Sequence, residues 1–175
     1  MNKILALLII AILTCGGCKK EGVGISFNLG YTASATIQSG SILNLPIDFF
    51  TPDITTNSEA EFAENDTRKD KIISTELTSM NLRITAPSGK TFSFLKNIYF
   101  YINAEGLDEA RIAFKENVNS SAAVIQLTTE DVNLAEYIKK EKYSLRLECV
   151  TRETINQDID VSSDMVFKVK ANPLK

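Results

Sequence analysis

The amino-acid sequence predicts a mainly β protein: an antiparallel two-sheet β-sandwich of the immunoglobulin-like kind, with about eight or nine strands and one or two short helices. Apolar residues recur at every second position in many short segments, which is the period of a strand with one buried face. Turn residues separate these segments at short intervals, and no regular alternation of strand and helix patterns is present. A closed β-barrel is the alternative arrangement of the same strands.

The alternating segments give the expected strands. They are residues 31–37, 42–47, 77–85, 98–103, 110–114, 122–128, 143–149 and 165–169. Pro46 has no N–H to donate, so its strand is expected at a sheet edge or a bulge. The strongest turn signal is Pro87 to Lys90, and its place between two β segments predicts a hairpin.

Two helices are expected. Thr67 and Asp70 have the spacing of a capping box, which predicts a helix from residue 67 to about Ser74. Residues 129–140 begin with acids and end with lysines, an arrangement that complements a helix dipole. The Thr-, Asn- and Glu-rich residues 54–66 are expected to form either a strand with a solvated face or an extended loop.

The first 17 residues have the pattern of a secretory signal peptide. Lys3 supplies the positive charge, the run from Ile4 to Leu13 is entirely apolar, and small residues follow to Gly17. Because a membrane-spanning helix needs about 20 apolar residues, this run is too short to cross a bilayer. We therefore expect residues 1–17 to be removed from the mature protein.

The end of this signal resembles the lipobox of bacterial lipoproteins, in which a small residue precedes the modified Cys. Gly17 and Cys18 match that pattern, whereas Cys15 stands where the family usually has Leu. Modification of Cys15 is the alternative, with Thr14 a poorer match before the cut. The chain thus resembles the small lipoproteins of Gram-negative bacteria, although no motif places the mature domain in a characterised family.

The resemblance implies that Cys18 carries a diacylglyceryl group and a further acyl chain, which together anchor a protein stably in a lipid bilayer. Residues 18–24 are then the lipidated Cys and a flexible tether, and residues 25–175 form a single β-sandwich domain. Lys19 follows the modified Cys, and in enteric-type sorting this implies the outer membrane. We expect a lipid-anchored protein of the cell envelope. The sequence does not distinguish an anchor on the periplasmic side of the membrane from one on the cell surface.

Composition limits the chemistry that the chain can perform. The sequence holds 19 Lys and Arg against 22 Asp and Glu, a net charge of −3, and no His. This acidic balance argues against nucleic acid as a partner, which calls for a basic face. The lack of His removes the commonest general base and metal ligand. We therefore expect no cofactor, no metal and no enzymatic activity, and we expect Cys149 to face inward as an inert thiol.

The acidic residues could in principle bind calcium or catalyse hydrolysis. Asp158, Asp160 and Asp164 are spaced like the start of a calcium loop, but an EF-hand then requires Gly and Glu where Ser163 and Val169 stand. A calcium site of another kind or a solvated turn remains open. Hydrolysis by a pair of carboxylates would need two acids across one cleft, which sequence spacing cannot show.

The aromatic residues give one positive indication. Tyr99 and Tyr101 share a strand face opposite Ile98 and Phe100. If the Ile and Phe side is the core, two tyrosines stand outward and would suit a sugar or protein partner. Alternatively, both tyrosines lie under the helix expected at residues 130–140.

Three functions follow in order of preference. The first is a membrane-anchored, non-enzymatic interaction or structural module of the cell envelope, with an unknown envelope protein or glycan as partner. The second is a glycan- or lipid-binding lipoprotein, which predicts a concave apolar pocket. The third is a carboxylate-based hydrolase, which predicts two buried acids with shifted pKa values facing one cleft.

Overall fold

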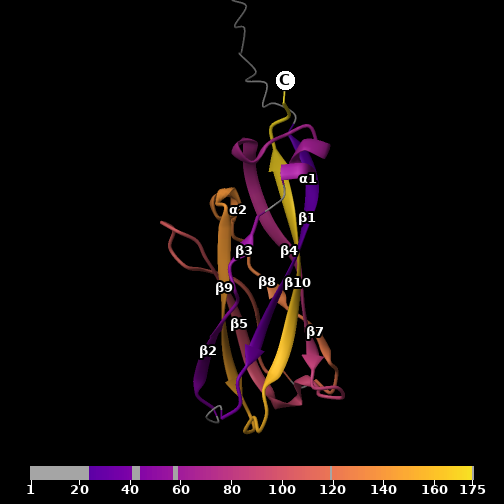
Figure 1. The fold of residues 1–175 in the computed structure, drawn as a ribbon, viewed down its shortest axis with the longest axis vertical. Helices are drawn as coiled ribbons and strands as arrows, with labels where there is room; N and C mark the ends of the chain where they lie inside the picture. The colour runs from indigo at the N-terminus through magenta and orange to yellow at the C-terminus, as the bar shows by residue number, and fades with distance from the viewer. Residues whose placement is uncertain (1–23, 41–43, 57–58, 119, 175) are drawn as a thin grey trace, which may run out of the picture.

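The computed structural model describes residues 24–40, 44–56, 59–118 and 120–174. They form two antiparallel sheets that pack face to face, with the strands running along the long axis of the molecule (Figure 1). This confirms the predicted β-sandwich, and because the two sheets remain separate, the barrel alternative is wrong.

The first sheet has four strands in the order β1-β10-β4-β7. Their bounds are β1 Ile25–Ile37, β10 Ile159–Ala171, β4 Ile72–Ala86 and β7 Val124–Gln126. The second sheet has the order β2-β9-β5-β6-β8, and the short β3 also pairs with β9. Their bounds are β2 Pro46–Phe50, β3 Ile54–Thr55, β5 Leu95–Asn103, β6 Ala110–Lys115, β8 Thr128–Thr129 and β9 Lys142–Thr151. The short β2 is an edge strand, as Pro46 predicted.

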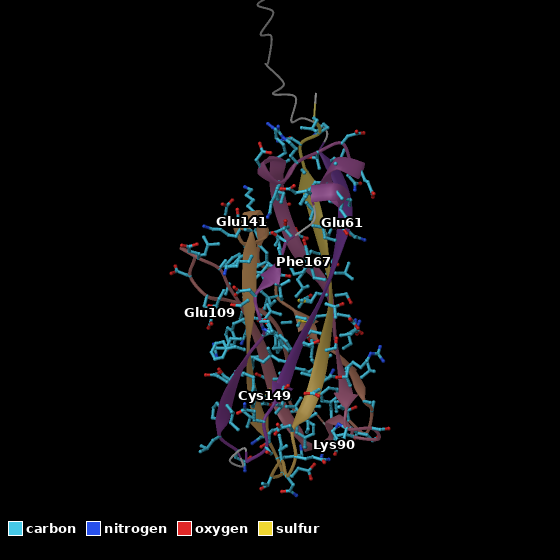
Figure 2. The ribbon with its side chains drawn as sticks, in the orientation of Figure 1. Glu61, Lys90, Glu109, Glu141, Cys149 and Phe167 are labelled. Atoms are coloured by element: carbon cyan, nitrogen blue, oxygen red, sulfur yellow. The ribbon has the colours of Figure 1, made fainter. Side chains whose placement is uncertain are left out.

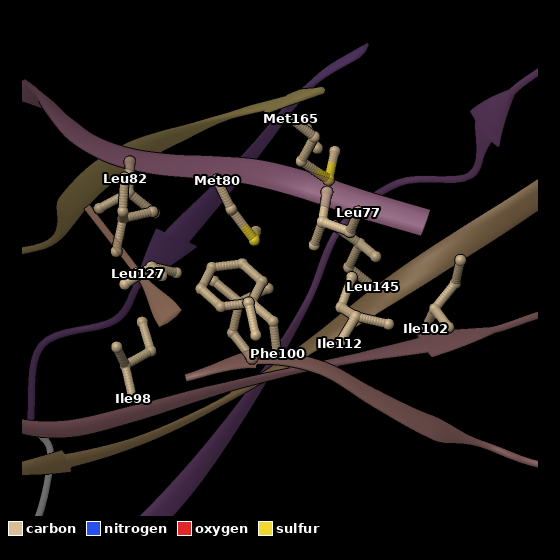
Figure 3. Packing of buried hydrophobic residues seen from close by; sticks show 14 of the residues in the cluster. Leu77, Met80, Leu82, Ile98, Phe100, Ile102, Ile112, Leu127, Leu145 and Met165 are labelled. Carbon is tan, nitrogen blue, oxygen red and sulfur yellow. The ribbon is translucent and has the colours of Figure 1, made fainter. Parts of the chain in front are cut away.

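The core lies between the two sheets and is built from the inward positions of the alternating strands. Met80 and Leu82 of β4 face Ile98 and Phe100 of β5 across the sandwich, all four fully buried (Figure 3). Phe167 of β10 lies in the same layer (Figure 2). Burying side chains of this size stabilises the fold by about 1.5–3 kcal/mol each, which fixes the register of the strands that carry them.

The helices are shorter than expected and partly elsewhere. The first, α1 (Glu59–Glu64), lies in the segment expected to be a strand or loop, of which only β3 is a strand. The predicted helix from residue 67 to Ser74 is wrong: a 3₁₀ turn η1 spans Lys69–Lys71, and β4 begins directly after it. Pairing of β4 with β10 over its whole length outweighs the local capping pattern.

The second helix, α2 (Ala135–Lys139), covers only the end of residues 129–140, because Thr128 and Thr129 pair with β6 instead. A further 3₁₀ turn, η2, spans Phe92–Phe94. In the described part of the chain, no helix combines the length and apolar character needed to cross a membrane.

The turn at Pro87 to Lys90 does not close a hairpin. It follows β4 in the first sheet and leads towards β5 in the second, so it carries the chain from one sheet to the other. The turn itself was predicted correctly, but the pairing was wrong. Local turn chemistry specifies a reversal of the chain, whereas the partner of each strand is set by packing between distant segments.

The two long sides of the sandwich differ. On one side β7 pairs with β4 and β8 pairs with β6, so a single segment joins both sheets. Leu127 between them is buried, and its N–H donates to the Met80 carbonyl at 2.9 Å. On the other side the edges are β1 in the first sheet and β2 with β3 in the second. No described strand joins the sheets there, so this side is open.

Candidate functional site

The open side presents β1 as a long edge strand. It pairs antiparallel with β10 over all 13 of its residues, from Ile25 opposite Ala171 to Ile37 opposite Ile159, without a bulge. Leu29 and other inward residues are buried and hold this register. No described strand pairs with the other edge of β1.

The sequence of β1 contains none of the usual protection of an edge strand. Natural edges avoid unwanted pairing through charged side chains, proline, bulges or short length. Between Ile25 and Ile37 the chain has no Lys, Arg, Asp, Glu or Pro, and its outward side chains are small and mostly polar. The neighbouring edge differs, because β2 is short and begins at Pro46. The strand β1 is therefore the edge most open to pairing with another chain.

The facing edge is interrupted between β2 and β3. There, the Thr51 N–H donates to the Leu145 carbonyl at 2.9 Å, and the Leu145 N–H donates to the Thr51 hydroxyl at 2.9 Å. The hydroxyl of the buried Thr51 thus accepts the hydrogen bond that a main-chain carbonyl would accept in a regular strand pair. The segment after β2 can therefore separate from β9 at Pro52 without leaving the Leu145 N–H unpaired. An ion pair of 2.6 Å between Asp53 and Lys142 fixes the far end of the interruption.

A groove lies between these two edges. Cavities of 540 and 360 Å³ are each lined by residues of both edges, and Ser34 and Pro52 line both. We call this region, residues 31–36 of β1 with residues 48–55, the edge groove. Phe50 lines it and is 64% exposed, a large apolar side chain left in water. The edge groove therefore combines an unpaired strand edge with apolar surface.

The acids around the edge groove are already engaged. Asp48 lies 2.6 Å from Arg146, and Asp160 accepts a hydrogen bond of 2.7 Å from the Thr36 hydroxyl. A partner would therefore meet main-chain hydrogen-bonding groups and apolar surface more than unbalanced charge.

Tyr99 and Tyr101 lie on the outer face of the second sheet, while Ile98 and Phe100 are fully buried. The outward orientation is thus as expected. The Tyr99 hydroxyl donates to Glu116 at 2.8 Å, and burial together with this carboxylate raises the pKa of Tyr99.

Arginines from the neighbouring strands cover these two rings. The Arg111 guanidinium lies 5.9 Å from the Tyr99 ring centroid, and that of Arg146 lies 4.0 Å from the Tyr101 centroid. The alternative that helix 130–140 covers them is wrong, because α2 packs against β4, β9 and η1.

Arg146 organises this face. It binds Glu109 through two nitrogens, at 2.5 and 3.0 Å, and also contacts Asp48 at 2.6 Å and Glu148 at 3.3 Å. Hydrogen bonding to Arg146 lowers the pKa of Glu109, and the same bond raises the pKa of Arg146. The protein's own carboxylates bind Arg146, and Arg146 itself stacks on the Tyr101 ring. This face is therefore covered by an internal network and offers little open aromatic surface to a sugar.

The other predicted residues lie apart. Cys18 and Cys15 are outside the described residues. Cys149 is fully buried in β9, as expected, and burial raises the pKa of its thiol (Figure 2). Within the described segments, no Asp or Glu is buried, so the carboxylate hydrolase hypothesis finds no pair of acids in a cleft.

The acids of the calcium-like stretch accept hydrogen bonds from β1 and from the turn that follows it. Asp158 accepts the Ser39 N–H at 2.8 Å, and Asp164 accepts the Thr32 hydroxyl at 3.1 Å. Their alternation follows the strand, which spreads them along its length. No cluster of three or more Cys, Asp or Glu that could hold a metal occurs in the described part of the chain.

One end of the sandwich carries α1 and the C-terminal residues (Figure 1). Residues of both segments line a further cavity there, of 760 Å³. We call it the end pocket. It is lined by Glu59, Phe62, Ala63, Thr67, Arg68, Lys69, Asp70, Lys139 and Leu174. The glycan- or lipid-binding hypothesis predicted a concave apolar pocket, and this one has an apolar side, formed by Phe62, Ala63 and Leu174, among charged side chains. Sequence reasoning missed it, because α1 has one buried apolar residue and so no helical stripe.

Comparison with known proteins adds no family. No family model matches the sequence, and no curated protein matches it. Among solved structures, the chain is similar to a chain of Desmodium yellow mottle tymovirus with a TM-score of 0.30. The two share 10% sequence identity, over 100% of this chain and 97% of that one. A similarity of that size carries no argument about function.

Proposed function

We propose that the chain is a membrane-anchored lipoprotein of the bacterial cell envelope, a non-enzymatic interaction module that holds an extended segment of another envelope protein along β1. The observation that carries this proposal is the edge of β1 itself. It is 13 residues long, runs without a bulge, contains no charge or proline, and borders the edge groove.

Strand addition is the binding mode that this geometry supports. In that mode an extended segment pairs with a free sheet edge, main-chain hydrogen bonds supply the affinity, and pockets for alternate side chains supply specificity. Ala35, Phe50 and Pro52 line the edge groove, where every second side chain of an added strand would lie. The outward side chains of β1 are small, so they leave the edge accessible.

The proposed anchor would keep this edge close to a membrane. If Cys18 is acylated, β1 begins at Ile25, and a segment of that length spans at most roughly 25 Å. A partner bound along β1 would then be a protein of the same envelope. Lys19 supports the outer membrane as its place.

A photo-crosslinking amino acid at Ser34 tests the edge. Ser34 is exposed and lines both cavities of the edge groove, whereas Ser26 is exposed on the same face of β1 and lines neither. We expect crosslinking in cells at Ser34 to give a discrete adduct with one envelope protein, mapped to an extended segment of it. The same probe at Ser26 is the matched control. The absence of an adduct at Ser34 would refute the proposal, and adducts of equal yield at Ser26 would refute the part of it that places the bound segment in the edge groove.

The anchor is tested separately. Mass spectrometry of the mature protein should find its first residue to be Cys18, carrying acyl chains. The Cys18→Ala variant should leave the membrane fraction. A mature N-terminus elsewhere without fatty acids would remove the anchored part of the proposal and leave the edge of β1 to be judged by crosslinking alone.

A further inference from the structure

We propose that the end pocket binds a long-chain fatty acid, with its carboxylate at Lys69 and its chain along Ala63 and Leu174, over the buried Phe62. The pocket lies at the end of the sandwich, away from the edge groove, and its volume of 760 Å³ lies within the usual range for small-molecule sites. This inference does not depend on the function proposed for β1.

The apolar wall is fixed by contacts from three segments. The buried Phe62 ring packs edge-on against Phe27 of β1, with 5.5 Å between the ring centroids. The Thr67 hydroxyl donates to the Asn172 carbonyl at 2.6 Å, and the Leu174 N–H donates to the Asp66 carbonyl at 2.6 Å. These bonds hold the C-terminal residues against the end of α1, so the pocket is preformed.

The wall leaves apolar surface uncovered. Leu174 is 42% exposed, and Ala63 is exposed beside it on the pocket lining. Burial of such surface by an acyl chain is favourable in proportion to the area removed from water. The wall therefore selects a ligand with a substantial apolar part.

Lys69 supplies the polar anchor. Its ammonium donates to the Lys140 carbonyl at 2.5 Å and to the Thr56 hydroxyl, both neutral acceptors. Partial burial lowers the pKa of Lys69 although the charges of Glu59 and Glu141 act to raise it, and neither acid forms an ion pair with Lys69 within the described segments. An ammonium has three N–H donors, so one remains for a ligand oxygen. A carboxylate there would make a charge-assisted hydrogen bond.

The other cations of the pocket already have acidic partners. Arg68 pairs with Asp70 at 3.2 Å, and Lys139 pairs with Glu136 at 2.8 Å. Lys69 is thus the best-placed cation for an anionic head group. One cation without an ion pair to an acid among the described residues, beside an apolar wall, fits a single-chain amphiphile with a small anionic head, which is the chemistry of a fatty acid.

The test uses the full-length mature protein in phosphatidylcholine nanodiscs with an added diazirine-bearing fatty acid. Light-induced adducts should map to peptides containing Phe62 or Leu174. They should fall about tenfold in Lys69→Gln, the factor expected for losing one charge-assisted bond. They should fall similarly in Ala63→Trp, which fills the pocket. Lys69→Arg should retain most of the labelling, and excess palmitate should compete.

Lys168→Gln is the matched control, because Lys168 is exposed on β10 and does not line the pocket. It should label as the wild type does, and equal thermal unfolding of all variants should show that each is folded. The proposal fails if Lys69→Gln and Lys168→Gln label equally. It fails also if a diazirine-bearing diacyl phospholipid labels the same peptides more strongly than the fatty acid, since a bilayer lipid would then be the ligand.

Discussion

The guanidinium of Arg146 lies 4.0 Å from the centre of the Tyr101 ring, and its nitrogens bind carboxylates from three separate segments, while the side chain as a whole is only 16% exposed. One of these, Asp48, belongs to β2, the edge strand that borders the edge groove. The same arginine therefore organises the outer face of the second sheet and holds the strand that forms one wall of the proposed binding site.

Replacing Arg146 should destabilise the sandwich. In Arg146→Ala, Asp48, Glu109 and Glu148 would lose their shared cation and repel one another, and the Tyr101 ring would lose its cover. We expect a loss of about 2 kcal/mol in the free energy of unfolding, measured in urea. Arg146→Lys should lose less, because it keeps the charge without the planar fork. An unfolding midpoint unchanged in Arg146→Ala would show that the network contributes nothing.

The pH dependence of stability should include Glu109. Arg146 lowers the pKa of Glu109 in the folded protein. The ionised Glu109 therefore contributes its full stabilisation at pH values above 4.5, its ordinary pKa, and this contribution is lost as the pH falls through the lower pKa of the folded protein. At pH 7 we expect Glu109→Gln to be less stable than wild type by about 1 kcal/mol, since a third of the side chain is in water. The gap should narrow as the pH falls below 4.5 and the carboxylate of the folded protein takes up its proton. A constant gap across that range would contradict the assignment.

Much of this fold could be predicted from the sequence because strand alternation is a local signal. The segments around Phe100, Leu147 and Phe167 alternate over several residues, and each became a strand with the expected inward face. The prediction of a helix at residues 67–74 was wrong because part of this segment pairs with a strand that is distant in the sequence: Ile72 lies opposite Ala171 of β10. The burial of Cys149 was predicted for the same reason as the strands.

The candidate sites could not be predicted, because they depend on which strands lie at the edges. Nothing near Ser34 in the sequence indicates that Pro52 will lie across a groove from it. The role of Lys69 likewise depends on the Lys140 carbonyl, 71 positions away. The outward orientation of the tyrosines follows from their alternation with Ile98 and Phe100, but the arginines that cover them come from other strands.

The stability of the chain between β2 and β3 should depend on the Thr51 hydroxyl, which accepts the Leu145 N–H. Thr51→Val keeps the shape of the side chain but leaves the Leu145 N–H without its acceptor, so we expect a loss of about 1–3 kcal/mol in unfolding free energy. Thr51→Ser keeps the oxygen and should lose clearly less. If the two variants unfold alike, the hydroxyl is not the acceptor that matters.

The thiol of Cys149 should be unreactive in the native protein. It is fully buried and its pKa is raised, so thiolate is scarce and reagents have no access. A maleimide should modify the peptide containing Cys149 only after denaturation. Cys149→Ser should reduce stability by about 1–3 kcal/mol, because it buries a hydroxyl in an apolar layer. Rapid labelling under native conditions would place the thiol outside the core.

Hydrogen exchange of the β1 amides tests the central claim most directly, because strand addition must pair the edge of β1 that has no neighbouring strand among the described residues. The full-length protein would be compared in native membranes, where its partner is present, and after purification into detergent micelles. We predict that the peptide covering residues 31–36 exchanges more slowly in membranes, while peptides of β9 exchange equally in both. Equal exchange of residues 31–36 in the two samples would contradict the account.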